Sequence, residues 1–275
     1  LTLGKHLRSD VRQAGLIVRN PGVQQHFEKP TTNDVGIFMQ EVRQRFGDQV
    51  KIIGITGTRG KSTTTALIGH ILKNKFGQRT VHVGGNIGVS PLTFLDQVKP
   101  GHIVVLELSS WLLRDLHDPG LDVAVVTNLL RDHMNYYQNM SLYQRDKERI
   151  FLGQTKTQIA VLNKHDVRVR GMARKTAARV KWFTTKFVAG AKLLGEHNHS
   201  NVAAAWQVAK VFGMTDRQIT KAVQSFQPLA NRLEIVRRYK GRMFVNDTTA
   251  TTPDATIAAL LAFKKKVILI AGGNT

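Results

Sequence analysis

The sequence has no cysteine among its 275 residues, which excludes disulfide bonds and thiolate metal sites. It also lacks an apolar run long enough to span a bilayer, and its N-terminus lacks the apolar core of a signal peptide. Acidic residues are few, because 19 aspartates and glutamates face 40 lysines and arginines. These features predict a cytoplasmic protein. The net charge of +21 predicts anionic partners such as nucleotides, nucleic acids or acidic lipids.

Length and composition are those of a globular protein. Hydrophobic residues make up 42% of the chain and charged residues 21%. A chain of this length holds one large or two medium domains. Because it begins at Leu1 rather than methionine and stops at Thr275 just after an apolar run, we expect a piece of a longer protein.

The most informative stretch is an apolar segment, a glycine loop and a helical segment in succession. Ile52–Ile55 predicts a buried strand, Gly57 and Gly60 a loop, and Lys61 the start of a helix. In this order, the backbone N–H groups of the loop can turn inward around an anion, and the helix N-terminus adds partial positive charge. Lys61 would reach the outer phosphates of a nucleotide, and the Ser62 hydroxyl would hold Mg²⁺.

This loop departs from the general P-loop spacing, which places a glycine six residues before the lysine. That position is Ile55, so the match is to a variant, T-G-T-x-G-K-[ST], over residues 56–62. Taken alone, the stretch leaves two interpretations open. One is a phosphate-binding loop, and the other is a glycine-rich turn ahead of an ordinary helix.

Apolar strands and helical segments alternate regularly from Lys51 onward. Several strands are apolar enough to be buried on both faces, which favours a parallel sheet covered by helices. The predicted strands cover residues 15–18, 51–56, 79–84, 103–108, 123–128 and 158–162, and the predicted helices cover 34–46, 61–76, 198–212 and 216–226. The basic segment 168–181 is not assigned to an element.

The C-terminal part predicts a second unit. Residues 228–231 are interpreted as a hinge, and residues 234–246 as a strand pair that turns at Lys240-Gly241. A helix (253–263) and a strand (267–271) follow. The predicted fold class is therefore α/β, with a mostly parallel, helix-flanked sheet that contains the P-loop and with the start of another α/β unit.

Three polar clusters follow predicted strands, at the edge where open parallel sheets bind ligands. They are Gly84–Gly88, Leu106–Ser110 and Thr127–His133. Glu107 or His133 alone would by default be an ordinary hydrogen-bonded residue. Beside a P-loop, however, a carboxylate and an imidazole suit Mg²⁺, which takes few protein ligands and completes its shell with substrate oxygens.

Together these motifs resemble the Mur ligases of peptidoglycan synthesis, ATP-dependent enzymes that join an amino acid to a UDP-linked muramoyl precursor. The loop at 56–62 has the family's form of the P-loop, which accounts for Ile55. Four further motifs resemble the branch that adds D-glutamate: G-G-N-I-G at 84–88, L-E-L-S-S-W at 106–111, T-N-x-x-x-D-H at 127–133 and N-D-T-T-A-T at 246–251. The resemblance runs from about residue 15 to the end of the chain.

The resemblance implies a domain organisation and a reaction. Residues 1–35 would be a remnant of the N-terminal UDP-binding domain, 36–232 the central ATP-binding domain, and 233–275 the truncated start of a Rossmann-like C-terminal domain that binds the amino acid. The reaction would join D-glutamate to UDP-N-acetylmuramoyl-L-alanine through an acyl phosphate. The implied enzyme is a monomer with no nucleic-acid or membrane partner.

The resemblance also assigns roles to individual residues. The implied catalytic residues are Lys61, His133 and Lys147. The implied ATP-binding residues are Thr56, Gly57, Thr58, Gly60, Lys61, Ser62 and Thr63 in the loop, Asn198 and Asn201 near the adenine, Arg232 at the phosphates and Asp247 at the ribose. Two Mg²⁺ ions are implied, with Ser62, Glu107, His133 and Lys147 as ligands. Asn86 and Ser109 would place the muramoyl substrate.

Lys147 matches the lysine that this family carbamylates with CO₂, which turns a cation into a carboxylate-like group beside the metal. Its charge-rich neighbours alone predict an ordinary solvated lysine instead. Three positions depart from the family's pattern. Leu112 replaces a common glutamine, Asn231 replaces the histidine before the hinge arginine, and Thr249 replaces a lysine, a change expected to weaken contacts to phosphates or to the amino acid.

Other functions stay open. The chain could be a related ligase for a different carboxylate, or an inactive fragment that only binds ATP. A P-loop ATPase dependent on nucleic acid is suggested by the net charge. It is opposed by the lack of aromatic residues interleaved with the basic clusters Arg168–Lys181 and Lys264–Lys266.

Overall fold

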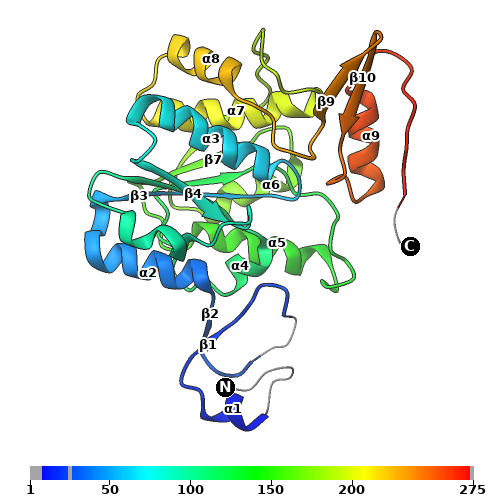
Figure 1. Ribbon diagram of the computed structural model, residues 1–275. Coiled ribbons are helices and arrows are strands. Elements are labelled where there is room, and N and C mark those ends of the chain that lie inside the picture. The colour runs from blue at the N-terminus through cyan, green and yellow to red at the C-terminus, as the bar shows by residue number, and fades with distance from the viewer. Residues whose placement is uncertain (1–7, 24–26, 273–275) are drawn as a thin grey trace.

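A six-stranded parallel β-sheet forms the centre of the computed structural model, which describes residues 8–23 and 27–272 (Figure 1). From edge to edge, its strands are β4 (Val81–Gly85), β5 (Ile103–Glu107), β3 (Lys51–Thr56), β6 (Val123–Val126), β7 (Ile159–Asn163) and β8 (Arg179–Phe183). Ile53 in β3 lies in register with Val105 in β5 and Val123 in β6. The order of the strands reverses at β3, the topological switch point at which open α/β sheets bind ligands.

Helices cover both faces of the sheet, as its apolar strands require (Figure 1). One side holds α3 (Lys61–Phe76), α7 (His197–Val211) and α8 (Asp216–Ser225), and the other holds α2 (Asp34–Phe46), α4 (Ser110–Arg114), α5 (Met140–Glu148) and α6 (Val167–Met172). The short 3₁₀ helices are η1 (Gly47–Gln49), η2 (Pro91–Gln97), η3 (Arg149–Phe151) and η4 (Ala173–Lys175). In β3, Ile53 and Ile55 enter the core of the α3 side, whereas Ile52 enters the core of the α2 side.

Two smaller segments adjoin this sheet unit. The N-terminal one contains α1 (Arg8–Gln13) and a short parallel pair, β1 (Ile17–Val18) and β2 (Thr31–Thr32). Arg19, just after β1, forms a buried ion pair with Asp115 beyond α4, in which Arg19 Nε donates to Asp115 Oδ2 at 2.9 Å. The C-terminal segment contains the hairpin of β9 (Glu234–Tyr239) and β10 (Arg242–Asn246), followed by α9 (Pro253–Leu261).

Most of the predicted elements are confirmed, with boundaries that shift by at most two residues. Both ends of α3 and the hairpin turn at Lys240-Gly241 agree with the sequence-based prediction. The predicted strand at 267–271 is wrong. No described segment pairs with these residues, and Ile268 and Ile270 are 92% and 94% exposed, so the backbone there has no ladder to join.

The basic segment left unassigned contains α6 and the start of β8. Because β8 is an edge strand, only one of its sides needs a partner strand, and its exposed Arg179 and Lys181 are compatible with the ladder. Among the described residues, no helix has both the length and the apolar character needed to cross a bilayer.

A pair of histidines lies near the amino ends of β4 and β5. His82 Nε2 and His102 Nδ1 are 2.9 Å apart, so one ring donates its proton to the other, and the buried His82 ring stacks on Phe94. Burial lowers the pKa of both rings below the ordinary value. His102 and Lys73 lower the pKa of His82 further, and Lys99 does the same for His102.

We expect the free energy of unfolding to fall as the pH drops below about 6.5, because the unfolded histidines then bind protons that the folded ones do not. Each histidine contributes at most about 1.4 kcal/mol per pH unit. In urea denaturation between about pH 7 and pH 5, the double variant His82→Gln, His102→Gln should lose stability less steeply than the parent. The surface control His165→Gln should match the parent; equal slopes for parent and double variant would refute this prediction.

Candidate active site

The carboxyl ends of β3, β5 and β6 bring distant segments of the sequence together. The loop after β3 leads into α3, β5 ends at Glu107, and Asn128 follows β6. Thr58 N donates to Asn128 O (3.0 Å), and Arg59 N donates to Asn128 Oδ1 (2.8 Å). The glycine loop is therefore fastened to the end of the neighbouring strand.

Gly57 and Gly60 are required by close packing around the loop. Gly57 has a φ of 146°, and a Cβ at this position would collide with Thr127 Oγ1. Gly60 has a φ of 79°, and a Cβ there would collide with Asn201 Oδ1. Because only glycine combines these backbone angles with the available space, the two residues fix the shape of the loop.

Lys61 and Ser62 are the first two residues of α3 and directly follow the glycine loop. Lys61 Nζ donates to Thr58 O (3.0 Å), which leaves two of its three donors for a ligand. Ser62 Oγ accepts a hydrogen bond from Arg232 Nη2 (3.1 Å). Burial lowers the pKa of Lys61, whereas the Glu107 carboxylate opposes this shift. Three residues predicted to contact phosphates or metal, Lys61, Ser62 and Arg232, thus lie together at the start of α3.

The hydroxyl groups of the loop threonines Thr56 and Thr58 interact with side chains of α5. Thr58 Oγ1 lies 3.2 Å from the hydroxyl of Tyr143 in α5, and Thr56 Oγ1 lies 3.5 Å from Lys147 Nζ. Thr63 is half-buried in the first turn of α3. The hydroxyls of Thr56 and Thr58 and the N–H groups of Thr58 and Arg59 thus have partners within the protein, which leaves the other backbone N–H groups of the loop as its donors for an anion.

Lys147 is buried, so the prediction of an ordinary solvated lysine is wrong. Only 1% of its surface is exposed, because α5 packs its inner side against the loop. Its Nζ donates to Gly57 O (2.9 Å) and lies 4.6 Å from the centre of the Tyr143 ring. Burial lowers the pKa of Lys147 well below the ordinary value, and Lys61 lowers it further. Both effects favour the neutral, nucleophilic amine.

Glu107 carries an unpartnered carboxylate oxygen at the end of β5. Oε1 accepts from Asn86 Nδ2 (2.9 Å), whereas the buried Oε2 has no hydrogen-bond partner in the described part of the chain. The negative charge of this carboxylate opposes the lowering of the pKa of both Lys61 and Lys147. A buried carboxylate oxygen without a partner is costly unless a cation or donor completes it.

The donor set fits Mg²⁺. Within residues 8–23 and 27–272, no three His, Asp or Glu side chains are grouped to hold a metal ion by themselves. Mg²⁺ uses one or two carboxylates and takes its other ligands from water and phosphate oxygens. The unpartnered oxygen of Glu107 and the hydroxyl of Ser62 are donors of this kind.

His133 lies in the loop after β6, with its side chain 38% exposed. Its φ is 57°, its Nε2 lies 3.8 Å from Asp132 Oδ2, and its ring centre lies 4.7 Å from that of Trp111. Burial lowers the pKa of His133, Asp132 opposes this shift, and Lys147 and Lys61 add to it. The neutral imidazole that results is the form that binds metal ions.

Asn198 and Asn201 connect the first turns of α7 to the P-loop. Asn201 Nδ2 donates to Asn198 Oδ1 (2.8 Å), and Asn198 Nδ2 donates to Leu194 O (2.6 Å). Asn201 Oδ1 accepts from Thr64 Oγ1 (3.3 Å). These bonds fix the Asn201 side chain beside Gly60, and the family resemblance implies that this region lies near the adenine.

The hinge around Arg232 has an unusual backbone. Asn231 and Leu233 have φ values of 61° and 47°, a conformation that costs energy for leucine in particular. Asp247 Oδ1 accepts from Leu233 N (3.0 Å), and Thr249 Oγ1 donates to Asn231 O (2.7 Å). Two of the departures from the family's pattern, Asn231 and Thr249, are therefore in contact and hold the hinge together.

A pocket of about 270 Å³ has Asn86, Ser90 and Arg19 among its lining residues. Asn86 connects this pocket to the carboxylate through its hydrogen bond to Glu107. Ser109, the other predicted substrate residue, does not line it. The Ser109 hydroxyl accepts from Leu112 N (3.2 Å) and so caps α4.

Sequence reasoning missed Arg59, which occupies the variable position of the loop. Its Nη2 donates to Thr252 Oγ1 (2.6 Å) and lies 3.6 Å from Asp132 Oδ2. Thr252 is the N-cap residue of α9, so Arg59 connects the P-loop to the C-terminal segment. The sequence shows a cation at this position of the loop, which is a signal for a functional role. It does not show the partner of Arg59, because Thr252 lies 193 residues away in the sequence.

Replacing Arg59 with methionine should loosen the C-terminal segment. A charged hydrogen bond at a partly exposed site contributes about 1 kcal/mol, which corresponds to roughly fivefold more frequent opening. Hydrogen exchange of the α9 amides measures this opening, with Arg217→Met on the surface of α8 as the control. Unchanged protection of α9 would show that Arg59 does not hold the segment.

These features define a class: an α/β protein with a glycine loop of the P-loop type at the switch point of a parallel sheet. The family described as "Mur ligase middle domain" matches residues 55–190. The chain belongs to the Mur ligase family.

Curated relatives match over most of this chain. It is 33% identical over 310 residues to the UDP-N-acetylmuramoylalanine–D-glutamate ligase of Roseiflexus sp. (strain RS-1), covering 98% of this chain and 66% of that protein. It is 36% identical over 242 residues to the protein of the same name from Zymomonas mobilis, covering 85% of this chain and 54% of that protein. The chain thus spans between about half and two thirds of the length of these relatives.

Solved structures share the fold. A crystal structure of MurF from Acinetobacter baumannii superposes with a TM-score of 0.69 at 18% identity, covering 90% of this chain and 62% of that one. MurF ligase from Thermotoga maritima in complex with ADP gives a TM-score of 0.64 at 20% identity, covering 83% of this chain and 60% of that one. At these low identities, both structural similarities show a shared fold.

Proposed function

We propose that this chain belongs to an ATP-dependent ligase that joins D-glutamate to UDP-N-acetylmuramoyl-L-alanine. The supporting observation is the geometry around the P-loop: Lys61 begins α3, the buried Lys147 donates to Gly57 O, and Glu107, which has an unpartnered carboxylate oxygen, lies in register with Ile55 just before the loop. Such an arrangement suits a reaction that brings two anions together, a triphosphate and a carboxylate. The names of the curated relatives supply the particular substrates.

The loop would hold ATP by its phosphates. Backbone N–H groups around Gly57 and Gly60 and the N-terminus of α3 provide positive potential, and Lys61 would contact the β- and γ-phosphates. Arg232 would contact the same phosphates, and its hydrogen bond to Ser62 supports this role. Asn198 and Asn201 would border the adenine, and Asp247 would bind the ribose.

The chemistry would proceed in two steps that conserve every atom. A carboxylate oxygen of the precursor attacks the γ-phosphorus, and ADP leaves, which gives an acyl phosphate. The amine of D-glutamate then attacks the acyl carbon and loses a proton. Phosphate leaves with the former carboxylate oxygen, and an amide remains. Lys61 would stabilise the charge that develops on the transferred phosphoryl group.

Ser62, Glu107 and His133 are the residues that would hold Mg²⁺, with two ions in the site. When bound, Mg²⁺ supplies positive charge that lowers the repulsion between the two anions. Asn86 would orient Glu107 and border the muramoyl substrate, since it donates to Glu107 Oε1 and lines the adjacent pocket. Ser109 would contribute by positioning the start of α4.

Lys147 would act as a carbamate. Its neutral amine would add to the carbon of CO₂ and release a proton, which leaves a negatively charged group beside the loop. The buried position and the lowered pKa of Lys147 support this modification, because a protonated amine is not a nucleophile. The carbamate would complete the metal-binding group together with Glu107.

The proposal includes the three-part division of the chain. Residues 1–35 would belong to the domain that binds the uridine diphosphate, 36–232 to the ATP-binding domain, and 233–275 to the domain that binds D-glutamate. The hinge at Arg232 and the contact between Arg59 and Thr252 lie where the last two parts meet.

A substrate panel tests the proposal. Phosphate release from ATP is measured for the complete gene product with each UDP-muramoyl precursor and each amino acid. We expect release only with UDP-N-acetylmuramoyl-L-alanine and D-glutamate, and a product heavier by one glutamyl residue. Phosphate release with a different precursor and amino acid would show that the proposed substrates are wrong. Phosphate release that nucleic acid stimulates in the absence of a precursor would overturn the ligase proposal.

A further inference from the structure

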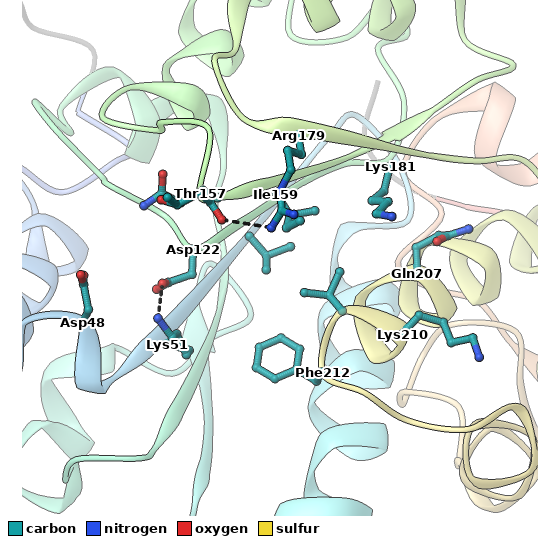
Figure 2. Close-up of a pocket in the computed structure, with 13 residues that line it drawn as sticks. Asp48, Lys51, Asp122, Thr157, Ile159, Arg179, Lys181, Gln207, Lys210 and Phe212 are labelled. Carbon is teal, nitrogen blue, oxygen red and sulfur yellow. Dashed lines mark hydrogen bonds and ion pairs between the residues drawn. The ribbon is translucent and has the colours of Figure 1, made fainter.

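We infer that a second anion-binding pocket lies at the amino edge of the sheet, and that it takes a phosphate monoester joined to an apolar group. The pocket has a volume of about 760 Å³ (Figure 2). It is lined by the first residues of four strands, namely Lys51 of β3, Val123 of β6, Ile159 of β7 and Arg179 of β8. The P-loop follows the opposite end of β3, about 20 Å away along a six-residue strand.

We call this space the amino-edge pocket. Its surface is apolar where Val123, Ile159, Val211 and Phe212 line it. Figure 2 shows Lys51 and Asp122 on one side of the space, Lys181, Gln207 and Lys210 on the other, and Phe212 between them. The rim carries four cations, Lys51, Arg179, Lys181 and Lys210, against two carboxylates, Asp48 and Asp122, so it is basic on balance. The volume of the pocket lies within the range of small-molecule sites.

Two of the basic groups on the rim are already paired with carboxylates. Lys51 Nζ lies 3.0 Å from Asp122 Oδ1, a carboxylate that Arg43 also contacts at 2.7 Å. Lys210 Nζ lies 2.7 Å from Asp216 Oδ1. These pairs form a polar border for the pocket.

The other two cations have no carboxylate partner. Arg179 Nη2 donates to a backbone oxygen, Thr157 O, at 3.5 Å. In the part of the chain that the structure describes, no carboxylate lies within 4.0 Å of Arg179 or Lys181. Both side chains are exposed. Two positive charges at the rim therefore lack a counter-charge.

The spacing of these two cations selects the size of the anion. Arg179 and Lys181 are two residues apart on one strand, so they emerge on the same face of β8 about 7 Å apart. A single phosphate group can contact both. A phosphate monoester carries a charge of about −1.5 to −2 at neutral pH, which matches the two free cations, and the guanidinium fork suits its oxygens. The apolar surface would hold the group esterified to the phosphate.

The surrounding surface increases the local positive potential. Eight exposed lysines and arginines lie in the segment 164–186: Lys164, Arg168, Arg170, Arg174, Lys175, Arg179, Lys181 and Lys186. The only acidic residue of this segment, Asp166, accepts backbone N–H groups of Leu129, Arg168 and Val169. Part of the net charge of +21 is thus concentrated in the segment that contains β8, and this charge attracts anions to that edge of the sheet.

Phenyl phosphate is the probe, because it joins a phosphate monoester to an apolar ring. In amide NMR titrations of the 275-residue chain, we expect saturable shifts at residues 179–181 and 207–212, both in the parent and in Lys61→Ala. The double variant Arg179→Gln, Lys181→Gln should bind at least about tenfold more weakly. The double variant Lys164→Gln, Lys175→Gln removes the same charge nearby and should bind like the parent.

The same titrations can overturn the inference. Shifts confined to residues 56–62, equal weakening in both double variants, or no saturable shift would each remove the amino-edge pocket as a site. Benzoate, with a single negative charge, should bind more weakly than phenyl phosphate, and equal affinity would refute the selection of a phosphate. A single-stranded oligonucleotide is titrated in the same way. If it binds more tightly than phenyl phosphate and shifts amide signals throughout residues 164–186, the basic segment binds nucleic acid and the inference of a small phosphate ligand is wrong. Spectra of the variants without ligand show whether each is folded.

Discussion

Replacing Lys61 with alanine should slow phosphate release by the complete gene product on the order of 1,000-fold. Lys61 is the amine that begins α3, and two of its three donors are available to the β- and γ-phosphates. Without it, the charge that develops during phosphoryl transfer loses a fixed cation in a partly buried site, where water replaces it poorly.

Two matched variants make this test specific. Lys99→Ala removes a lysine from an exposed loop and should leave the rate unchanged. Lys61→Arg keeps the charge but changes the reach and the hydrogen-bond geometry, so it should recover only part of the rate. A near-normal rate in Lys61→Ala, with the protein folded, would remove Lys61 from the phosphate site.

Replacing Lys147 with alanine should lower activity on the order of 100- to 10,000-fold, and short carboxylates such as formate or acetate should restore part of it. The alanine variant leaves a cavity beside Gly57 and Thr56 where the buried side chain lies. A small carboxylate in that cavity would supply the negative charge that the carbamate is proposed to provide.

The variant Lys147→Met is the matched control. Methionine fills most of the space of the lysine stem, so the fold is retained but no carboxylate can enter. We expect both variants to be inactive and only Lys147→Ala to respond to carboxylates. If a folded Lys147→Ala protein does not respond to any carboxylate, the carbamate proposal fails, whereas the ligase proposal stands on the other measurements.

The core of the fold and the position of the site could be predicted because their signals are local. Ile52–Ile55 and the following glycines encode a strand, a loop and a helix within a dozen residues, and α3 has the predicted ends. Polar residues directly after apolar strands meet at one edge, because parallel strands all end there. Glu107 and Asn128 lie at that edge for this reason.

Burial and pairing across the chain could not be predicted from the same signals. Lys147 has charged neighbours in sequence, and only the packing of α5 on the loop shows that it is enclosed. Arg59 reaches Thr252, a residue beyond the hinge. The apolar run at 267–271 has the composition of a strand, but a strand requires a partner, and the described chain provides none. The role of each residue here depends on a distant neighbour.

The central claim is that the P-loop holds ATP for attack by a carboxylate rather than by water. The most direct measurement follows ¹⁸O from the labelled carboxylate of UDP-N-acetylmuramoyl-L-alanine during turnover with ATP and D-glutamate. Attack by the carboxylate predicts that each released phosphate carries one ¹⁸O atom, because that oxygen bridges carbon and phosphorus in the acyl phosphate. Released phosphate without ¹⁸O, or phosphate labelled instead from H₂¹⁸O, would contradict this account.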